Sequence, residues 1–331
     1  MAEVVLSNLS KSFGATKALQ DVSLTIPDGS FVVLLGPTGA GKTTTLRLIA
    51  GLEKPDSGDI RISGASVALE TPAQRDVAMV FQQYSLYPHL TVRDNLAFPL
   101  RSPIIAMPEP EITKHVQKVA DVLRIAHKLD NKATALSGGE MQRVSIGRAL
   151  VRNPRIYLMD EPLSSLDAKL RADLRVELKR IHAELGATFL YVTHDQIEAM
   201  TMATHVGVLD QGRLVQFGSP REIYEDPVST YVASRLGQPR MTLLPADAFG
   251  PPRPGATLIG LRPENIRQGS GPSATVRRVE RLGDQTRLHL TMGIHEIVTL
   301  ADAHTPLGPD DIIQIHPENP LWFDASGDRI R

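Results

Sequence analysis

Short apolar runs alternate with amphipathic segments through about the first 235 residues. The apolar runs predict buried strands, and they are Val4–Leu9, Phe31–Leu35, Val77–Phe81, Ile156–Met159 and Thr188–Val192. The amphipathic segments predict helices, and they are Lys42–Ala50, Ile112–Arg124, Glu140–Val151 and Leu170–Leu185. Alternation of this kind predicts an α/β fold, in which helices cover the faces of a largely parallel sheet.

The pattern changes near residue 236, where prolines become frequent and no long helical segment follows. Further short runs predict strands, at Leu258–Leu261, Ala274–Val279, Arg287–Thr291, Ile294–Leu300 and Ile312–His316. They indicate a small all-β module. We therefore expect two domains, 1–235 and 236–331, which also suits a chain of 331 residues.

Composition narrows the possible functions. A formal net charge of −1 gives no support to a nucleic-acid partner, which usually leaves a basic patch. The chain has no cysteine, so disulfides and thiolate metal sites are excluded. Its apolar runs are far shorter than the roughly 20 residues of a membrane-spanning helix. The segment Met1–Val4 also lacks the basic and apolar regions of a signal peptide. We expect a chain that does not cross a bilayer.

One octapeptide, Gly36-Pro37-Thr38-Gly39-Ala40-Gly41-Lys42-Thr43, has the pattern G-x-x-x-x-G-K-[ST]. It lies between a predicted strand and a predicted helix, the context in which this pattern binds phosphate. Glycines let backbone amides turn toward phosphate, and the helix N-terminus adds partial positive charge. Lys42 is expected to neutralise the β- and γ-phosphates and Thr43 to ligate Mg²⁺. The residues predicted to bind the nucleotide here are Gly36, Pro37, Thr38, Gly39, Ala40, Gly41, Lys42, Thr43 and Thr44.

An acidic pair, Asp160-Glu161, ends the apolar run that begins at Ile156. In α/β sheets, ligands bind at the carboxyl ends of the strands. Asp160 suits the shell of a Mg²⁺ ion, usually through water. Glu161 is placed to polarise an attacking water. Such a pair is often a solvated strand end, and it is the phosphate-binding pattern that favours catalysis.

A second glycine-containing segment, Leu136-Ser137-Gly138-Gly139-Glu140, precedes another predicted helix. Ser137 suits the N-cap, and the glycines leave backbone amides accessible. Taken alone, the segment is typical of an ordinary capped helix.

Together these motifs resemble those of ABC-type ATPases in their order along the chain. The octapeptide resembles the Walker A loop, Ile156–Asp160 the Walker B strand, and 136–140 the signature LSGGQ, with Glu140 in place of glutamine. The resemblance implies two copies arranged head to tail. Each ATP then lies between one copy's Walker A loop and the other's Ser137, Gly138, Gly139 and Glu140. The added negative charge of Glu140 is expected to weaken this contact slightly.

Four further residues fit the family in order and approximate spacing. The resemblance implies that Gln82 touches Mg²⁺ and the attacking water, and that His194 contacts the γ-phosphate. It also implies that Asp167 reaches the partner copy and that Phe13 stacks on adenine. The implied catalytic set is Glu161, His194 and Gln82, and the implied metal set is Thr43, Gln82 and Asp160. Taken singly, Gln82 could be a surface residue, Asp167 a helix cap and Phe13 a core residue.

The C-terminal module narrows the kind of ABC protein. Gly260–Asn265 and Gln238–Pro245 resemble the accessory OB-like domain of bacterial carbohydrate-importer ATPases, of the kind that serve maltose and glycerol phosphate, although Thr242 stands where asparagine is frequent. The implied fold is a P-loop NTPase domain with a helical subdomain at about 88–155, followed by an OB-like, TOBE-type β domain.

The resemblance also implies partners and a location. The partners are a second copy of the chain, two integral-membrane permease subunits and, indirectly, an extracytoplasmic solute-binding protein, with no nucleic acid. The location is the cytoplasmic face of the bacterial inner membrane, as a peripheral subunit. The segment Tyr84–His89 is expected to grip a coupling helix of the permease, with core packing as the alternative.

Three other functions stay open. An importer of polyamine, iron or an oxyanion uses similar ATPases. A non-transport ABC ATPase usually carries two cassettes or a coiled-coil insertion, and neither is found in this sequence. A small-molecule P-loop kinase is disfavoured by the signature segment and by His194. The expected cofactors are ATP and Mg²⁺, and the expected cargo is a sugar, a sugar derivative or a polyol.

Overall fold

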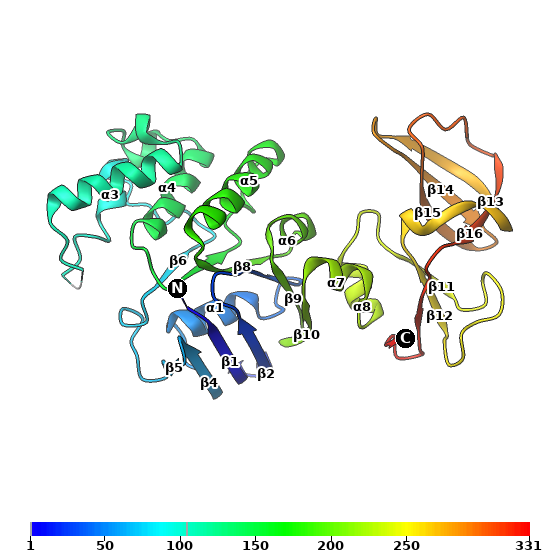
Figure 1. Ribbon diagram of the computed structural model, residues 1–331, viewed down its shortest axis with the longest axis horizontal. Helices are drawn as coiled ribbons and strands as arrows, with labels where there is room; N and C mark the ends of the chain where they lie inside the picture. Colours follow the sequence, from blue (N-terminus) through cyan, green and yellow to red (C-terminus); the bar gives the residue numbers. More distant parts are fainter. Residues whose placement is uncertain (1, 104) are drawn as a thin grey trace. The chain divides into compact units, whose positions relative to one another are not determined.

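The computed structural model describes residues 2–103 and 105–331. The chain divides into two compact units, the first ending at Pro220 and the second beginning at Arg221 (Figure 1). We expected the boundary near 236, after two short helices, α7 (Pro220–Glu225) and α8 (Thr230–Arg235). The division falls before α8 because Ala233 packs with Met241 and Phe323 of the β module.

A six-stranded sheet forms the centre of the first unit, in the order β10-β9-β3-β8-β7-β6. All neighbouring strands are parallel except the β9–β10 pair. The strands are β3 (Phe31–Leu35), β6 (Val77–Val80), β7 (Ile156–Asp160), β8 (Thr188–Thr193), β9 (His205–Asp210) and β10 (Arg213–Gly218). The predicted parallel sheet is confirmed, and β7 continues through the first acidic residue of the pair at its end.

Alternate residues of the central strands face two different layers. On one face, Val32 and Leu34 join a cluster with Leu46 of helix α1 (Lys42–Ala50). On the other face, Phe31 and Phe189 pack against His182 of helix α5 (Ala168–Leu185). This alternation, which follows from the two-residue period of a strand, gives the helices opposite sides of the sheet.

A second, antiparallel sheet packs against α1, in the order β2-β1-β4-β5. Its strands are β1 (Val4–Phe13), β2 (Thr16–Ile26), β4 (Ser57–Ile62) and β5 (Ala65–Ser66). Only the first part of β1 was predicted. In β2 the residues Val22, Leu24 and Ile26 are buried and alternate with exposed polar residues. That period-two pattern indicates a half-buried strand, so the signal for β2 was present in the sequence.

The predicted helical subdomain corresponds to the insertion between β6 and β7. It contains α2 (Val92–Ala97), α3 (Glu109–Val122), α4 (Gly138–Leu150) and the short 3₁₀ helices Ala126–Lys128 and Ala133–Ala135. Helices α3 and α4 lie at one end of the first unit (Figure 1). Ile112, Val116 and Ala120 recur every four residues along α3 and are its buried side.

The second unit consists mainly of two antiparallel four-stranded sheets, ordered β11-β12-β17-β18 and β15-β14-β13-β16. The strands are β11 (Thr242–Pro245), β12 (Leu258–Leu261), β13 (Ile266–Arg281), β14 (Thr286–Met292), β15 (His295–Ala301), β16 (Ile312–Pro317), β17 (Leu321–Phe323) and β18 (Arg329–Ile330), with a 3₁₀ helix at Pro263–Asn265. Leu261, Val276 and Leu290 are among its core residues. The predicted all-β module is confirmed.

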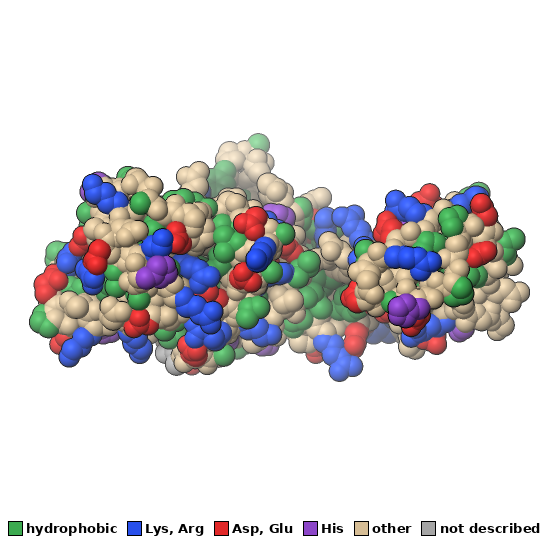
Figure 2. Space-filling view, turned by 90° about the horizontal axis from the view of Figure 1, so that it is seen from above, with side chains coloured by type: hydrophobic (Ala, Val, Ile, Leu, Met, Phe, Trp, Pro, Cys, Tyr) green, Lys and Arg blue, Asp and Glu red, His purple; other side chains and the backbone are tan. Residues whose placement is uncertain are grey.

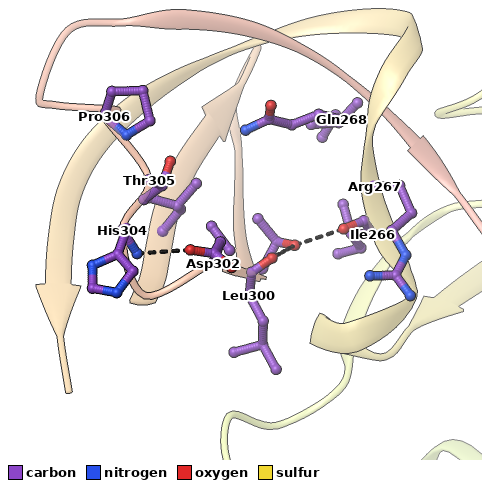
Figure 3. Close-up of a pocket in the computed structure, with 12 residues that line it drawn as sticks. Ile266, Arg267, Gln268, Leu300, Asp302, His304, Thr305 and Pro306 are labelled. Atoms are coloured by element: carbon purple, nitrogen blue, oxygen red, sulfur yellow. Dashed lines mark hydrogen bonds between the residues drawn. The ribbon is translucent and has the colours of Figure 1, made fainter. Parts of the chain in front are cut away.

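A pocket of about 400 Å³ opens beside β13 and β15 in this second unit (Figure 3). The His304 amide donates to Asp302 Oδ1, and Thr299 Oγ1 donates to the Ile266 carbonyl. These contacts satisfy several polar groups of the pocket within the chain itself.

The surface carries both signs of charge. Acidic and basic side chains are interspersed on the face drawn in Figure 2, in keeping with the net charge of −1. In the described part of the chain, no helix has the length and apolar character needed to cross a membrane.

Candidate active site

The phosphate-loop pattern forms a turn between β3 and α1. Gly41 is the N-cap of α1 and has φ +101°, a left-handed conformation that residues with a side chain rarely adopt. A Cβ at this position would lie 2.6 Å from the Ala18 carbonyl oxygen and 2.6 Å from Leu19 Cδ2. The loop therefore needs glycine at residue 41 for two reasons: its backbone conformation and its close approach to strand β2.

Lys42, the first residue of α1, is almost fully buried at 4% exposure. Its Nζ donates to the carbonyls of Gly36 at 2.8 Å and Pro37 at 3.0 Å. The same ammonium lies 3.5 Å from Glu161 Oε1. The charge of Lys42 is thus held between the loop backbone and the acidic pair that follows β7.

Thr43 and Asp160 bring two oxygen ligands together. Thr43 Oγ1 donates to Asp160 Oδ1 at 2.9 Å. Burial raises the pKa of Asp160, and the neighbouring Glu161 charge acts in the same direction. Hydroxyl and carboxylate oxygens are the hard ligands that Mg²⁺ prefers, and a divalent cation would offset the repulsion between the two carboxylates. These residues therefore fit a magnesium ion.

Glu161 lies between two other predicted site residues. His194 Nδ1 is 2.8 Å from Glu161 Oε2, while Lys42 faces the other carboxylate oxygen. The backbone of Glu161 has φ +43°, a left-handed conformation that costs a residue with a side chain about 1–3 kcal/mol. Strain of this kind is concentrated at functional sites. The turn after β7 thus holds the carboxylate between a lysine and a histidine.

Gln82 is linked to the same carboxylate residue through a serine. Its Nε2 lies 3.4 Å from Ser164 Oγ, and that hydroxyl donates to the Glu161 carbonyl at 2.9 Å. Ser164 was not among the predicted site residues. Its position three residues after Glu161 is the signal that could have identified it, because a hydroxyl at that spacing can close a turn.

Two buried side chains support the segment that carries His194. Tyr191 Oη donates to Glu198 Oε2 at 2.8 Å, and both side chains are buried. Asp195 caps the helix α6 (Gln196–Met202) by accepting from the Ile197 amide at 2.7 Å. The backbone is therefore fixed on both sides of His194. Burial raises the pKa of Glu198, which favours its neutral form.

Phe13 and Asp167 lie outside this group of contacts. Phe13, at the end of β1, is 45% exposed, so the alternative that it is a core residue is wrong. Lys11 Nζ lies 5.1 Å from its ring centroid. Asp167 caps α5 by accepting from the Leu170 amide at 3.0 Å.

The signature segment forms a second cluster with its own contacts. Ser137 is the N-cap of α4 and forms a capping box with Glu140. A Cβ on Gly139 would lie 2.4 Å from Leu170 Cδ2 of α5, so a larger residue here would have to displace the Leu170 side chain. The signature segment therefore contacts α5, whereas the phosphate loop contacts the end of β7.

Replacing Asp160 by asparagine is expected to stabilise the protein in the absence of a metal ion. Asparagine keeps an oxygen for Thr43 and removes a buried charge, so we expect a gain of about 1 kcal/mol in the free energy of unfolding at pH 7. Thermal unfolding of the variant and the parent measures this gain.

The gain should depend on pH in a definite direction. The pKa of Asp160 is raised in the folded state, so its contribution to stability is lost as pH rises through that pKa. The advantage of asparagine should therefore vanish below about pH 4, where the aspartic acid is protonated. An advantage that persists unchanged at low pH would contradict the assigned cause.

Comparison with known protein families matches both units. Residues 19–164 match the ABC transporter family and residues 259–325 match the TOBE domain. The chain is 45% identical over 329 residues to the sn-glycerol-3-phosphate import ATP-binding protein UgpC of Rhodopseudomonas palustris strain HaA2, covering 95% of this chain and 90% of that protein. It is 42% identical to the protein of that name from Cupriavidus pinatubonensis, over 100% of each chain.

Solved structures agree for the first unit. A nucleotide-free ATP-binding cassette from an ABC transporter is 30% identical with a TM-score of 0.59, covering 66% of this chain and 92% of that one. A bacterial ABC transporter cassette solved as a dimer is 31% identical with a TM-score of 0.60, covering 66% of this chain and 99% of that one. The chain belongs to the ATP-binding proteins of the ABC transporter family and carries a TOBE domain after its ATPase unit in the sequence.

Proposed function

We propose that this chain powers the import of a sugar, sugar derivative or polyol, with sn-glycerol 3-phosphate as the first candidate cargo. The observation that carries the proposal is the likeness to glycerol-phosphate import ATP-binding proteins across the whole chain, including the β module. The contacts of Lys42, Glu161 and His194 supply the hydrolytic chemistry.

The proposed hydrolysis uses the residues in distinct roles. Lys42 binds the β- and γ-phosphates of ATP, and Thr43 and Asp160 hold Mg²⁺, which neutralises phosphate charge when bound. Glu161 accepts a proton from the attacking water, whose oxygen bonds to the γ-phosphorus as the bond to ADP breaks. His194 holds the Glu161 carboxylate and contacts the γ-phosphate. Gln82 orients the attacking water.

The proposed active form contains two copies of the chain. Within one chain, the signature segment contacts α5 while the phosphate loop contacts the end of β7. A twofold pair lets Ser137, Gly138, Gly139 and Glu140 of one copy complete the nucleotide site of the other. A similar cassette solved as a dimer supports this arrangement. We also propose that Asp167 reaches the partner copy and that Phe13 stacks on adenine.

The proposed contact with the permease is a groove beside the helical insertion. A cavity of about 250 Å³ lies between β6 and α4, and Phe81 and Phe98 expose 41% and 49% of their surface there. Arg148 stacks on the Tyr87 ring at 4.6 Å and donates to the Ser85 carbonyl, which holds the segment Tyr84–His89 in place. A groove that exposes aromatic rings beside Arg148 and Arg152 suits an amphipathic coupling helix. The two permease subunits would place this chain at the cytoplasmic face of the inner membrane.

Phe98→Asp is expected to weaken binding to the permease at least tenfold, because it removes one of the exposed aromatic rings of the groove. ATP-dependent pairing of the isolated chain should be unchanged. Co-purification with the permease subunits and gel filtration with ATP measure the two properties. Leu69→Asp is the control, since Leu69 is 99% exposed outside the groove. Equal permease binding by both variants would refute the groove.

The cargo is tested with the complete importer in proteoliposomes. ATP hydrolysis should be stimulated when the importer's solute-binding protein carries sn-glycerol 3-phosphate, or else maltose or a free polyol. Stimulation by a polyamine, by ferric iron or by an inorganic oxyanion alone would replace the proposed cargo with that class.

A further inference from the structure

Glu140 makes contacts that distinguish a carboxylate from the glutamine of the family signature. Its Oε2 accepts from the Ser137 amide at 2.8 Å and from the Ser137 hydroxyl at 2.9 Å. Its Oε1 lies 3.1 Å from Lys128 Nζ. One carboxylate is therefore shared between a serine at the start of α4 and a lysine at the end of the 3₁₀ helix Ala126–Lys128.

The hydrogen bond from the Ser137 hydroxyl to Glu140 Oε2 fixes the direction of the hydroxyl proton. Because an ionised carboxylate can only accept, the serine proton points toward Glu140. A phosphate oxygen of the partner copy's ATP is also an acceptor. The Ser137 hydroxyl can therefore donate to the phosphate only if it gives up its hydrogen bond to the Glu140 carboxylate. Glutamine at this position could keep the amide contact of the capping box without the competing negative charge.

The charge state of Glu140 favours this competition. The Ser137 amide, which donates to the carboxylate, lowers the pKa of Glu140, and Lys128 adds to the effect. Glu140 is therefore ionised at neutral pH. Its side chain and that of Lys128 are 24% and 28% exposed, so solvent screens the pair only partly.

We propose that Glu140 competes with the γ-phosphate for the Ser137 hydroxyl and that Lys128 is a positioning residue that limits this competition. The inference rests on the proposed pair of chains around ATP. Lys128 pairs with the Glu140 carboxylate and partly neutralises its charge. The carboxylate then holds the Ser137 hydroxyl less strongly, and the hydroxyl can donate to the nucleotide instead. Lys128 lies nine residues before Ser137 and belongs to no motif of the nucleotide site.

The test is a double-mutant cycle in full-length chain that also carries Glu161→Gln, so that hydrolysis does not disturb the equilibrium. The readout is the ATP concentration at which half the chain pairs. Glu140→Gln should lower it about threefold and Lys128→Gln should raise it about threefold, the range of a partly exposed ion pair. In the Glu140→Gln background, Lys128→Gln should change it less than about 1.5-fold.

Two matched variants exclude a general effect of charge. Lys118→Gln removes an exposed positive charge from α3 and should leave the half-point unchanged. Lys128→Arg keeps the positive charge, and its half-point should stay close to that of the parent. The effect of Lys128→Gln should also shrink in 0.5 M salt, which screens the repulsion between Glu140 and the γ-phosphate.

The outcomes separate the inference from the proposed function. An effect of Lys128→Gln that is the same with and without Glu140 overturns the inference alone, as does a raised half-point for Glu140→Gln. A parent chain that binds ATP but never pairs overturns the proposed function and this inference with it.

Discussion

Glu161→Gln is expected to lower ATP hydrolysis at least about 100-fold while leaving ATP binding intact, because it removes the proposed proton acceptor and keeps the shape of the side chain. The carboxylate lies 3.5 Å from Lys42 Nζ and 2.8 Å from His194 Nδ1, so it lies between the lysine that we propose binds phosphate and the histidine that we propose contacts the γ-phosphate. The variant should accumulate as a pair of chains that holds ATP. Phosphate release and gel filtration with ATP measure the two effects.

The control for Glu161→Gln is the same substitution at Glu184. This residue is exposed at the far end of α5 and pairs with Arg180, so its loss should leave turnover unchanged. Normal turnover by the Glu161 variant would mean that another group accepts the proton from water.

Lys42→Ala is expected to weaken ATP binding about 100-fold, equivalent to roughly 3 kcal/mol, because it removes the buried charge that we propose binds the phosphates. The ammonium also bridges the Gly36 and Pro37 carbonyls, so its loss loosens the loop itself. Equilibrium binding of a fluorescent ATP analogue measures the effect. Lys54→Ala removes an exposed lysine and should bind like the parent. A Lys42 variant that binds equally well would show that the phosphates lie elsewhere.

Local patterns in the sequence were sufficient for strands β3, β6, β7 and β8 of the central sheet and for the loop after β3. The run Phe31–Leu35 and the helix Lys42–Ala50 match β3 and α1 in their bounds, because a buried strand and a helix closed by Gly51 carry strong local signals. The antiparallel strand β2 was missed because its apolar residues alternate only in its second half.

Contacts between distant residues could not be predicted. The boundary between the units lies before α8 because Ala233 packs on Phe323, ninety residues further along the chain. The capping box of Ser137 and Glu140 is visible in the sequence as a serine followed three residues later by glutamate. The pairing of that glutamate with Lys128 is not visible, since it depends on how the helical insertion folds.

In the proposed pair, each ATP site combines Lys42 of one chain with Ser137 of the other. Two variants test it, Lys42→Ala and Ser137→Arg, each in chains that also carry Glu161→Gln. Neither variant alone should form an ATP-bound pair. A mixture should, because a mixed pair keeps one intact site, formed by Lys42 from one chain and Ser137 from the other.

The decisive measurement is the amount of ATP retained by pairs isolated from that mixture. We expect one ATP per mixed pair, against two for the parent. A mixture that stays unpaired, or a Ser137→Arg chain that pairs alone with two ATP, would contradict the shared site.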